Sequence, residues 1–441
     1  METGEQPEQS TLVYPPFAHT LGIHRARPAH LKIFLGDRTR FDDPQGVAAV
    51  KFSFDDDPAR GDDFKLTLLG VNAGRGEILY NSSMQTLAVY GRKGTGEGEL
   101  ENPHGIAATT DGRIYVADTG NRRVVRLRWD PASRALRWSG TWPAGVPFDV
   151  EADARGSVWV TDREADAVLR FDDREAAADA TRLPPPLTPG DRWPLPDDVD
   201  APRGLAIADS ADAWFRPSAS RLYLVDRDGQ RLRAYDPEGV VVASIEARDV
   251  SPDDAGARFL YVELDYFGNV YVSDPAEGAL HKLDPDLRPL TTFKGPGPAE
   301  SALEEPRGIA IWKRFGQVFV AEREGAQYFF VGTDFRPLEE PLRVRRGAEG
   351  GPWELDLFLT EAATVRVAFL GRVGDTLAVA DVGTVGEGRQ AVGWDATEWQ
   401  SPPPEGWWER AERVVVEARP TYSSRRRFAR VRDFPLLWMD S

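Results

Sequence analysis

One structural skeleton recurs six times along this chain of 441 residues. The clearest copy runs from Asn102 to Val124: a Pro-x-Gly-apolar corner, a turn, an apolar strand ending in Val-x-Asp, and a second apolar strand. The anchor residues at the end of the first strand are Asn72, Asp118, Asp162, Asp226, Asp274 and Glu322. Successive anchors are 46, 44, 64, 48 and 48 residues apart, so the third interval carries an insertion. Self-similarity at this period predicts a repeat architecture.

The corner that opens each copy varies from one copy to the next. Five corners are Pro44-Gln-Gly-Val, Pro103-His-Gly-Ile, Pro147-Phe-Asp-Val, Pro202-Arg-Gly-Leu and Pro306-Arg-Gly-Ile. In the fifth copy Arg258-Phe-Leu-Tyr-Val stands in this place and lacks both proline and glycine. That copy is therefore degenerate.

Each copy is predicted to form four short strands. Segments such as 112–117, 157–161, 221–225 and 269–273 alternate β-branched or aromatic residues with smaller ones, which suits a pleated, half-buried strand. A period of 40 to 50 residues with four strands per unit is typical of propeller blades. Segments with helical periodicity are nearly absent, which excludes helical solenoids. The sequence thus predicts an all-β protein, a six-bladed β-propeller followed by a small β-sandwich.

The stretch from Gly94 to Trp129, with Gly96-Glu-Gly-Glu-Leu ahead of Asn102-Pro, resembles the NHL repeat family of six-bladed β-propellers. The resemblance covers residues 30–345, the predicted propeller domain. The segment Leu31–Gly36 is expected to be an outermost strand that pairs with Gln327–Val331. That pairing would close the ring and remove exposed sheet edges.

A different strand pattern follows, and residues 350–441 are predicted to form the β-sandwich. Leu359–Val367, Leu370–Gly374 and Gly388–Asp395 resemble the FlgD-like immunoglobulin-fold domain, although the likeness ends after Trp399. The resemblance implies a non-catalytic spacer or attachment module. The tryptophans of this region are expected to supply core and, where exposed, an interface; they are Trp394, Trp399, Trp407 and Trp408.

Composition excludes several classes of function. The chain has no cysteine, so disulfide and thiolate chemistry are absent. A net charge of −17 argues against nucleic-acid binding and anionic membranes, and no apolar run is long enough to span a bilayer. Residues 1–29 read as a polar tail or tether without a signal peptide in the sequence as given. We expect an extracytoplasmic protein (periplasmic, cell-surface or secreted), with a lipid anchor on a precursor left open.

The middle residue of each corner is predicted to project toward the mouth of the propeller channel. These residues are Gln45, His104, Phe148, Arg203, Phe259 and Arg307. Arginine offers a planar fork of donors for a carboxylate or another anion, and the aromatic rings could stack on a ligand. The alternative is that these side chains only rim the channel and pair with nearby acids.

The sequence disfavours three kinds of metal site. Five acidic anchors could surround a hard cation, but a residue that recurs in every blade more readily serves the backbone of its own turn. His104 matches a zinc histidine of the amidating lyases, which are NHL-type propellers, yet the other corners lack histidine and catalytic zinc needs three protein ligands. No set of residues in the sequence matches the calcium ligands of lactonase-type propellers. We therefore expect no catalytic residues, no metal and no cofactor.

A proline-rich segment, Leu183–Asp197, explains the long third interval. Proline-rich chain is already stiff and loses little entropy when it binds a partner. The alternative is a rigid strap packed on the propeller through Trp193.

These observations predict a non-catalytic binding or scaffold protein of the bacterial cell envelope or exterior. It would engage a protein, peptide or glycan through the loop face of the propeller. One alternative is a lyase or lactonase that depends on a divalent metal and has its site in the channel. Another is an envelope assembly component whose β-sandwich binds the β-sandwich of a second copy.

Overall fold

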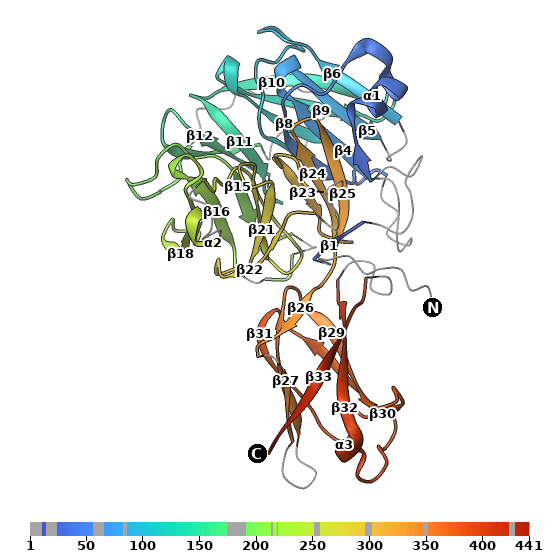
Figure 1. Ribbon diagram of the computed structural model, residues 1–441. Helices are drawn as coiled ribbons and strands as arrows, with labels where there is room; N and C mark the ends of the chain where they lie inside the picture. The colour runs from blue at the N-terminus through green and yellow to red at the C-terminus, as the bar shows by residue number, and fades with distance from the viewer. Residues whose placement is uncertain are drawn as a thin grey trace. The chain divides into compact units, whose positions relative to one another are not determined.

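The computed structural model of the protein is all-β and contains a six-bladed β-propeller (Figure 1). It describes residues 11–14, 24–55, 66–82, 86–154, 156–173, 191–212, 215–217, 219–250, 256–295, 302–339, 341–346, 352–422 and 428–440. The chain forms two compact units, one with Phe17–Lys294 and Ala302–Phe329, the other with Phe330–Ser441 and residues 11–14. The propeller prediction is confirmed.

Five of the blades are four-stranded antiparallel sheets built from consecutive strands. Blade one contains β3 (Pro44–Val50), β4 (Thr67–Asn72), β5 (Glu77–Ser82) and β6 (Thr86–Gly91). Blade two contains β7 (Ile106–Ala108), β8 (Arg113–Asp118), β9 (Arg123–Asp130) and β10 (Ala135–Pro143). Blade three contains β11 (Pro147–Ala152), β12 (Ser157–Asp162), β13 (Ala167–Asp172) and β14 (Asp191–Arg192). Blade four contains β15 (Leu205–Ala208), β16 (Arg221–Asp226), β17 (Arg231–Tyr235) and β18 (Val241–Glu246). Blade five contains β19 (Val262–Leu264), β20 (Val270–Asp274), β21 (Ala279–Leu283) and β22 (Pro289–Phe293).

The sixth blade is completed by the N-terminal part of the chain. It contains β23 (Ile309–Trp312), β24 (Gln317–Glu322) and β25 (Gly325–Val331). Its outer neighbour is β2 (Arg25–Ala26), which pairs with Ala326 and Gln327, while β1 (Leu12–Val13) pairs with Phe330 and Val331. The prediction that Leu31–Gly36 pairs with β25 was wrong. Its residues lie mainly in helix α1 (Pro28–Leu35), which begins with proline at its first turn, a position that proline favours.

Short helical segments connect several strands. These are η2 (Gly36–Arg38), η3 (Ala73–Arg75), η4 (Thr119–Asn121), η6 (Arg227–Gly229) and α2 (Ala247–Val250). Three of them directly follow an anchor residue, at the turn between the second and third strands of blades one, two and four. None of the helices in the described part of the chain is long and apolar enough to cross a membrane.

Five of the six anchor residues tie their blade to the corner that opens it. Asp118 accepts the Glu101 N–H at 2.7 Å, and Glu322 accepts the Glu304 N–H at 2.8 Å. Asn72, Asp162 and Asp274 likewise accept backbone N–H groups from the segments that lead into their own corners. Asp226 instead accepts the guanidinium groups of Arg231 and Arg233. Local hydrogen bonding therefore accounts for the repeated polar anchor.

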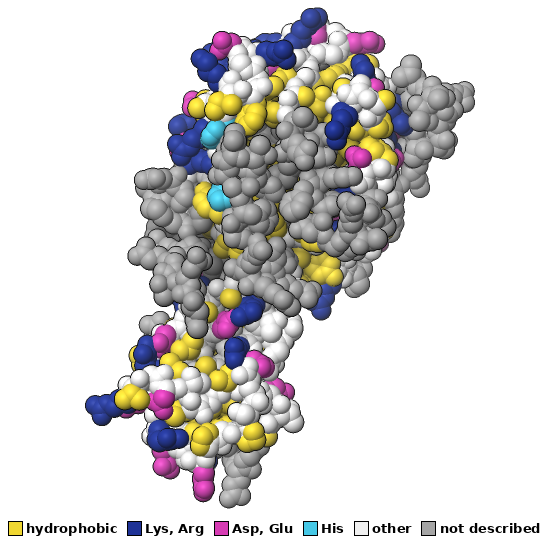
Figure 2. Space-filling view, turned by 90° about the vertical axis from the view of Figure 1, so that its right-hand side faces the viewer, with side chains coloured by type: hydrophobic (Ala, Val, Ile, Leu, Met, Phe, Trp, Pro, Cys, Tyr) yellow, Lys and Arg dark blue, Asp and Glu magenta, His cyan; other side chains and the backbone are white. Residues whose placement is uncertain are grey.

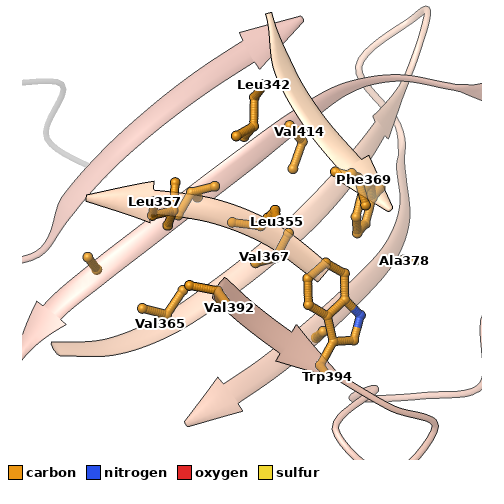
Figure 3. Packing of buried hydrophobic residues seen from close by; sticks show 14 of the residues in the cluster. Leu342, Leu355, Leu357, Val365, Val367, Phe369, Ala378, Val392, Trp394 and Val414 are labelled. Atoms are coloured by element: carbon orange, nitrogen blue, oxygen red, sulfur yellow. The ribbon is translucent and has the colours of Figure 1, made fainter. Parts of the chain in front are cut away.

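The C-terminal unit is a small β-sandwich with its own apolar core. Its elements are β26 (Phe335–Pro337), β27 (Leu342–Arg346), β28 (Trp353–Leu359), β29 (Ala363–Gly371), β30 (Thr376–Val385), β31 (Gly388–Trp394), α3 (Trp407–Arg410), β32 (Ala411–Pro420) and β33 (Arg430–Asp440). Strand β33 pairs in parallel with β27 and antiparallel with β32, which links the two halves of the unit. Figure 3 shows Leu355, Val367, Phe369 and Trp394 converging in the core between the strands.

The tryptophans of this unit mostly serve the core. Trp394 and Trp407 are 2% and 3% exposed, and Trp399 and Trp408 are partly buried against the same cluster. The Trp399 and Trp407 rings meet edge to face at 5.3 Å between centroids. None of these four side chains is fully exposed, so the expected aromatic interface is not displayed by them.

Candidate functional site on the propeller axis

Four corner glycines let neighbouring blades approach closely around the channel. The N–H groups of Gly46, Gly105, Gly204 and Gly308 donate to carbonyl oxygens of the next blade at 2.9–3.3 Å. A Cβ atom on Gly308 would lie 2.5 Å from the Gln45 carbonyl oxygen and 2.7 Å from the Gly46 Cα. Glycine is required here because backbone, which cannot move aside, occupies the space of a side chain.

Five of the six predicted rim residues occupy equivalent corner positions. The residues are Gln45, His104, Phe148, Arg203 and Arg307, each followed by the glycine position. The sixth, Phe259, is out of register by one residue: the carbonyl that accepts the Gly204 N–H belongs to Leu260. Phe259 is fully buried in the core between blades four and five, where its ring meets His281 at 5.9 Å. Without proline and glycine the fifth corner gave no sequence signal for its register.

Blades three and five place a side chain where the other four blades have glycine. The two residues are Asp149 and Tyr261, which are 7% and 4% exposed. The Tyr261 ring stacks on Phe148 at 5.5 Å, and its hydroxyl donates to Gln45 Oε1 at 3.2 Å. Asp149 Oδ2 accepts the Leu205 N–H at 3.1 Å and so joins blade three to blade four. These two side chains fill the axis at the level of the glycines.

A second substitution in the same two blades compensates for the lost glycine. The Asp149 N–H donates to Thr161 Oγ1 at 2.8 Å, and the Tyr261 N–H donates to Ser273 Oγ at 3.1 Å. The residues that correspond to Thr161 and Ser273 in the other blades are Val71, Ala117, Val225 and Ala321, none of which has a hydroxyl. Paired Gly-to-larger and apolar-to-hydroxyl changes were a sequence signal that could have identified the axis-filling residues.

The charged residues of the corner face, which we call the rim, are already paired with one another. Arg203 and Arg163 both bond Asp228 Oδ1, at 2.6 and 2.9 Å. Arg307 pairs with Asp43, which also accepts the Gln45 amide N–H at 3.1 Å. The guanidinium groups of Arg203 and Arg307 are 20% and 16% exposed, whereas the carboxylates of Asp228 and Asp43 are 55% and 40% exposed. The rim thus presents ordered carboxylates as well as arginines.

His104 is held as a neutral, partly buried ring at the rim. Burial lowers the pKa of His104 to about 4, and the nearby Arg163 and Arg307 act in the same direction against the Asn102 carbonyl and Asp43. Its Nδ1 lies 3.0 Å from the Asn102 carbonyl oxygen, which requires a proton on that nitrogen. The ring packs on Phe148 at 4.8 Å. His104 therefore contributes aromatic surface rather than charge at neutral pH.

The other end of the channel opens into a chamber with a cavity volume of about 670 Å³. It is lined by the far ends of the innermost strands and by the turns that follow them, from all six blades. Glu151 of blade three and Glu263 of blade five line its wall, where the corresponding residues of the other blades are Ala48, Ala107, Ala206 and Ala310. The same two blades that fill the axis thus also supply carboxyl groups to the chamber.

The chamber carboxyl groups have strongly shifted acidity. Burial, repulsion from Glu263 and, more weakly, from Asp149 raise the pKa of Glu151 to about 8, against the opposing pull of Lys313. Burial also raises the pKa of Glu263, and burial raises that of Asp149 to about 7. The acids around Lys313 raise the pKa of its ammonium group, which lies 3.4 Å from Asp212 Oδ2. None of these residues was predicted from the sequence as a site residue.

The described residues also bear on the proline-rich segment and on metal binding. In the proline-rich stretch, Leu183–Gly190 lies outside them, whereas Trp193 packs edge to face on Trp159 and Tyr235 at 5.6 and 5.9 Å. The described residues contain no group of three or more histidine, aspartate or glutamate side chains that could hold a metal ion. On the face shown in Figure 2, acidic and basic side chains of the described residues are interspersed.

Part of the chain matches a known repeat family and a relative from that family. The NHL repeat family profile matches residues 100–127. The chain is 38% identical over 104 residues to the mouse (Mus musculus) NHL repeat-containing protein 3, a match that covers 21% of this chain and 30% of that protein. It is similar in fold to virginiamycin B lyase from Staphylococcus aureus (TM-score 0.40, 12% identity, 60% of this chain and 76% of that one). It is also similar to the gluconolactonase XC5397 from Xanthomonas campestris (TM-score 0.43, 16% identity, 72% and 99%).

Proposed function

We propose that this protein is a non-catalytic binding protein that engages a protein or peptide partner through the rim. The observation that carries this proposal is the closure of the axis by Tyr261, Phe148 and Asp149 behind a rim of fixed charges. A filled axis offers a broad, rigid surface, and prearranged side chains lose little entropy when a partner docks. Guanidinium groups and aromatic rings are also the side chains enriched at the centres of protein interfaces.

The cellular setting is part of the same proposal. We place the protein outside the cytoplasm, at the bacterial cell envelope or beyond it, with the C-terminal β-sandwich as a FlgD-like spacer or attachment module. The absence of cysteine and the acidic composition are compatible with this setting. The likeness of the propeller to an NHL repeat supports a binding role, since repeat proteins commonly present extended binding surfaces.

A phage-displayed peptide library, panned against the full chain, tests the rim. Enriched peptides are expected to bind the Arg203→Ala/Arg307→Ala protein at least about tenfold more weakly, because two pairing partners of a bound carboxylate are lost. Arg372→Ala, an exposed change in the C-terminal unit, is the matched control and should bind normally. Equal affinity for the double variant, or binding of array glycans instead of peptides, would overturn the proposal. Stoichiometric zinc or calcium in elemental analysis would favour the lyase or lactonase alternative.

A further inference from the structure

We propose that the chamber at the far end of the propeller axis is a binding site for a small organic cation carrying ammonium groups, such as a diamine, with Glu151 and Glu263 as its carboxyl partners. The site is separate from the rim, because the two lie at opposite ends of the innermost strands. A failure of this proposal would therefore leave the rim proposal standing.

The chamber contains carboxyl groups that the protein itself does not neutralise. Among the described residues neither Glu151 nor Glu263 forms an ion pair, and Glu263 Oε1 accepts only the N–H of Leu264, at 2.8 Å. Lys313, the ammonium group that faces them electrostatically, bonds Asp212 instead. Two partly buried carboxyl groups thus border an open volume in which Lys313, which attracts both of them, is bonded to a third carboxylate. Groups in that situation either bind a proton or bind a cation from solution.

The positions of the two glutamates are specific to these blades. Four blades have alanine at the corresponding position, and alanine satisfies the packing of an innermost strand there. Both exceptions occur in blades that also lost the corner glycine, at Asp149 and Tyr261. If the two glutamates were only solvated surface residues, nothing would require blades three and five to differ together from the other four blades. They differ at the corner glycine, at the residue two positions later and at the residue before the anchor. The arrangement instead directs two carboxyl groups from different blades into one cavity.

Size and charge select the ligand class. A volume of about 670 Å³ lies in the range of small-molecule sites and far exceeds a single ion. No set of metal-ligating side chains is formed by the described residues, which disfavours a divalent metal. The acidic side chains of the chamber lining outnumber the basic ones by six to four; they are Asp111, Glu151, Asp153, Asp209, Asp212 and Glu263 against Lys51, Arg113, Lys313 and Arg314. An ammonium group donates hydrogen bonds to carboxylates and supplies the missing positive charge, and Trp312 in the chamber wall can cover an alkyl chain.

Protonation provides a signature of this site. With the pKa of Glu151 raised to about 8, its carboxyl group carries a proton at neutral pH. A bound ammonium group would displace that proton, because the charged carboxylate is the form that attracts it. The affinity should therefore rise with pH, by up to about tenfold per unit below the raised pKa, and level off above it. Measured heats should also differ between buffers of different ionisation enthalpy, since a proton is released.

Isothermal titration calorimetry of the full chain with putrescine and spermidine as probes tests the proposal. The measurement is made in 0.15 M salt, where the Debye length is about 8 Å and attraction between exposed charges is largely screened. One ligand per chain is expected, and Glu151→Gln and Glu263→Gln should each weaken binding at least about tenfold. Glu238→Gln, the same change at an exposed hairpin, should bind as the unaltered protein does. Because the chain is strongly acidic, this control separates the chamber from general attraction of amines to the surface.

A change of opposite sign sharpens the test. Lys313→Met removes the resident ammonium group and should strengthen amine binding severalfold, because the ligand no longer meets a like charge. Surface attraction predicts no such gain. Absence of one-site heat with either amine, equal binding of glucose as a neutral polyol, stoichiometric binding of calcium in place of the amines, or unchanged affinity in both glutamine variants would each overturn the assignment. Thermal melts of each variant show that it is folded.

Discussion

Blades one, two, four and six differ from blades three and five at three aligned positions of their inner strands. The first group has a corner glycine, an alanine two residues later and an apolar residue before the anchor. The second group has Asp149 or Tyr261, Glu151 or Glu263, and Thr161 or Ser273 at these places. The first group holds the ring together by close backbone contacts, whereas the second fills the axis and adds titratable groups. The copies of the repeat thus differ in what they contribute. Four copies supply close backbone contacts, and two supply the side chains that fill the axis and can titrate.

The largest expected effect is on the glycine blades. Gly308→Ala would place a Cβ 2.5–2.7 Å from backbone atoms of Gln45, Gly46 and Val47, and these atoms cannot rotate away. We expect a loss of at least about 3 kcal/mol in the free energy of unfolding, because blades six and one would be pushed apart. Chemical denaturation measures this loss. Gly70→Ala is the control, since its Cβ meets only the Leu79 carbonyl oxygen at 3.9 Å; similar losses for both variants would contradict the close-approach argument.

The sequence predicted the regular part of the propeller well because the recurring corner and anchor residues define the register of each copy. The anchors, the four-strand blades and the roles of Gln45, His104, Phe148, Arg203 and Arg307 as corner residues all follow from the Pro-x-Gly pattern. Phe259 was displaced by one residue because the fifth corner lacks both markers. Helix α1 was mistaken for a strand because Leu31–Leu35 is too short for its periodicity to distinguish the two. Glu151 and Glu263 escaped notice because acidity matters only once six strands place them around one cavity.

The second prediction concerns the hydroxyl groups of blades three and five. Thr161→Val keeps the shape of the side chain but removes the acceptor of the Asp149 N–H, which is buried. We expect a loss of about 2 kcal/mol, the cost of leaving a buried donor without a partner. Thr364→Val, an exposed change near the start of β29, is the control and should alter stability by less than about 0.5 kcal/mol. Equal effects of the two variants in denaturant titrations would show that the hydroxyl does not replace the glycine contact.

The smallest effect is expected from Glu151→Gln, and its sign depends on pH. The pKa of Glu151 is raised in the folded protein from the ordinary value of 4.5 to about 8. The neutral carboxyl group is therefore favoured by folding, and its contribution is complete below pH 4.5 and is lost as the pH rises through 8. Glutamine stays neutral throughout and avoids this loss. At pH 8 the variant should be more stable than the unaltered protein by about 1–2 kcal/mol, with little difference at pH 4.5.

Thermal melts of Glu151→Gln across this pH range test both the size and the sign. The groups that set the shift are Glu263, Lys313 and Asp149, so Glu263→Gln should reduce the pH dependence contributed by Glu151. Glu238→Gln, on an exposed hairpin, should follow the unaltered protein at every pH. A Glu151→Gln protein that was less stable at pH 8 would mean that the charged carboxylate already has a partner in the chamber. In that case the Glu151 carboxylate would already be neutralised by another group of the protein, and it would not be available to bind an added cation.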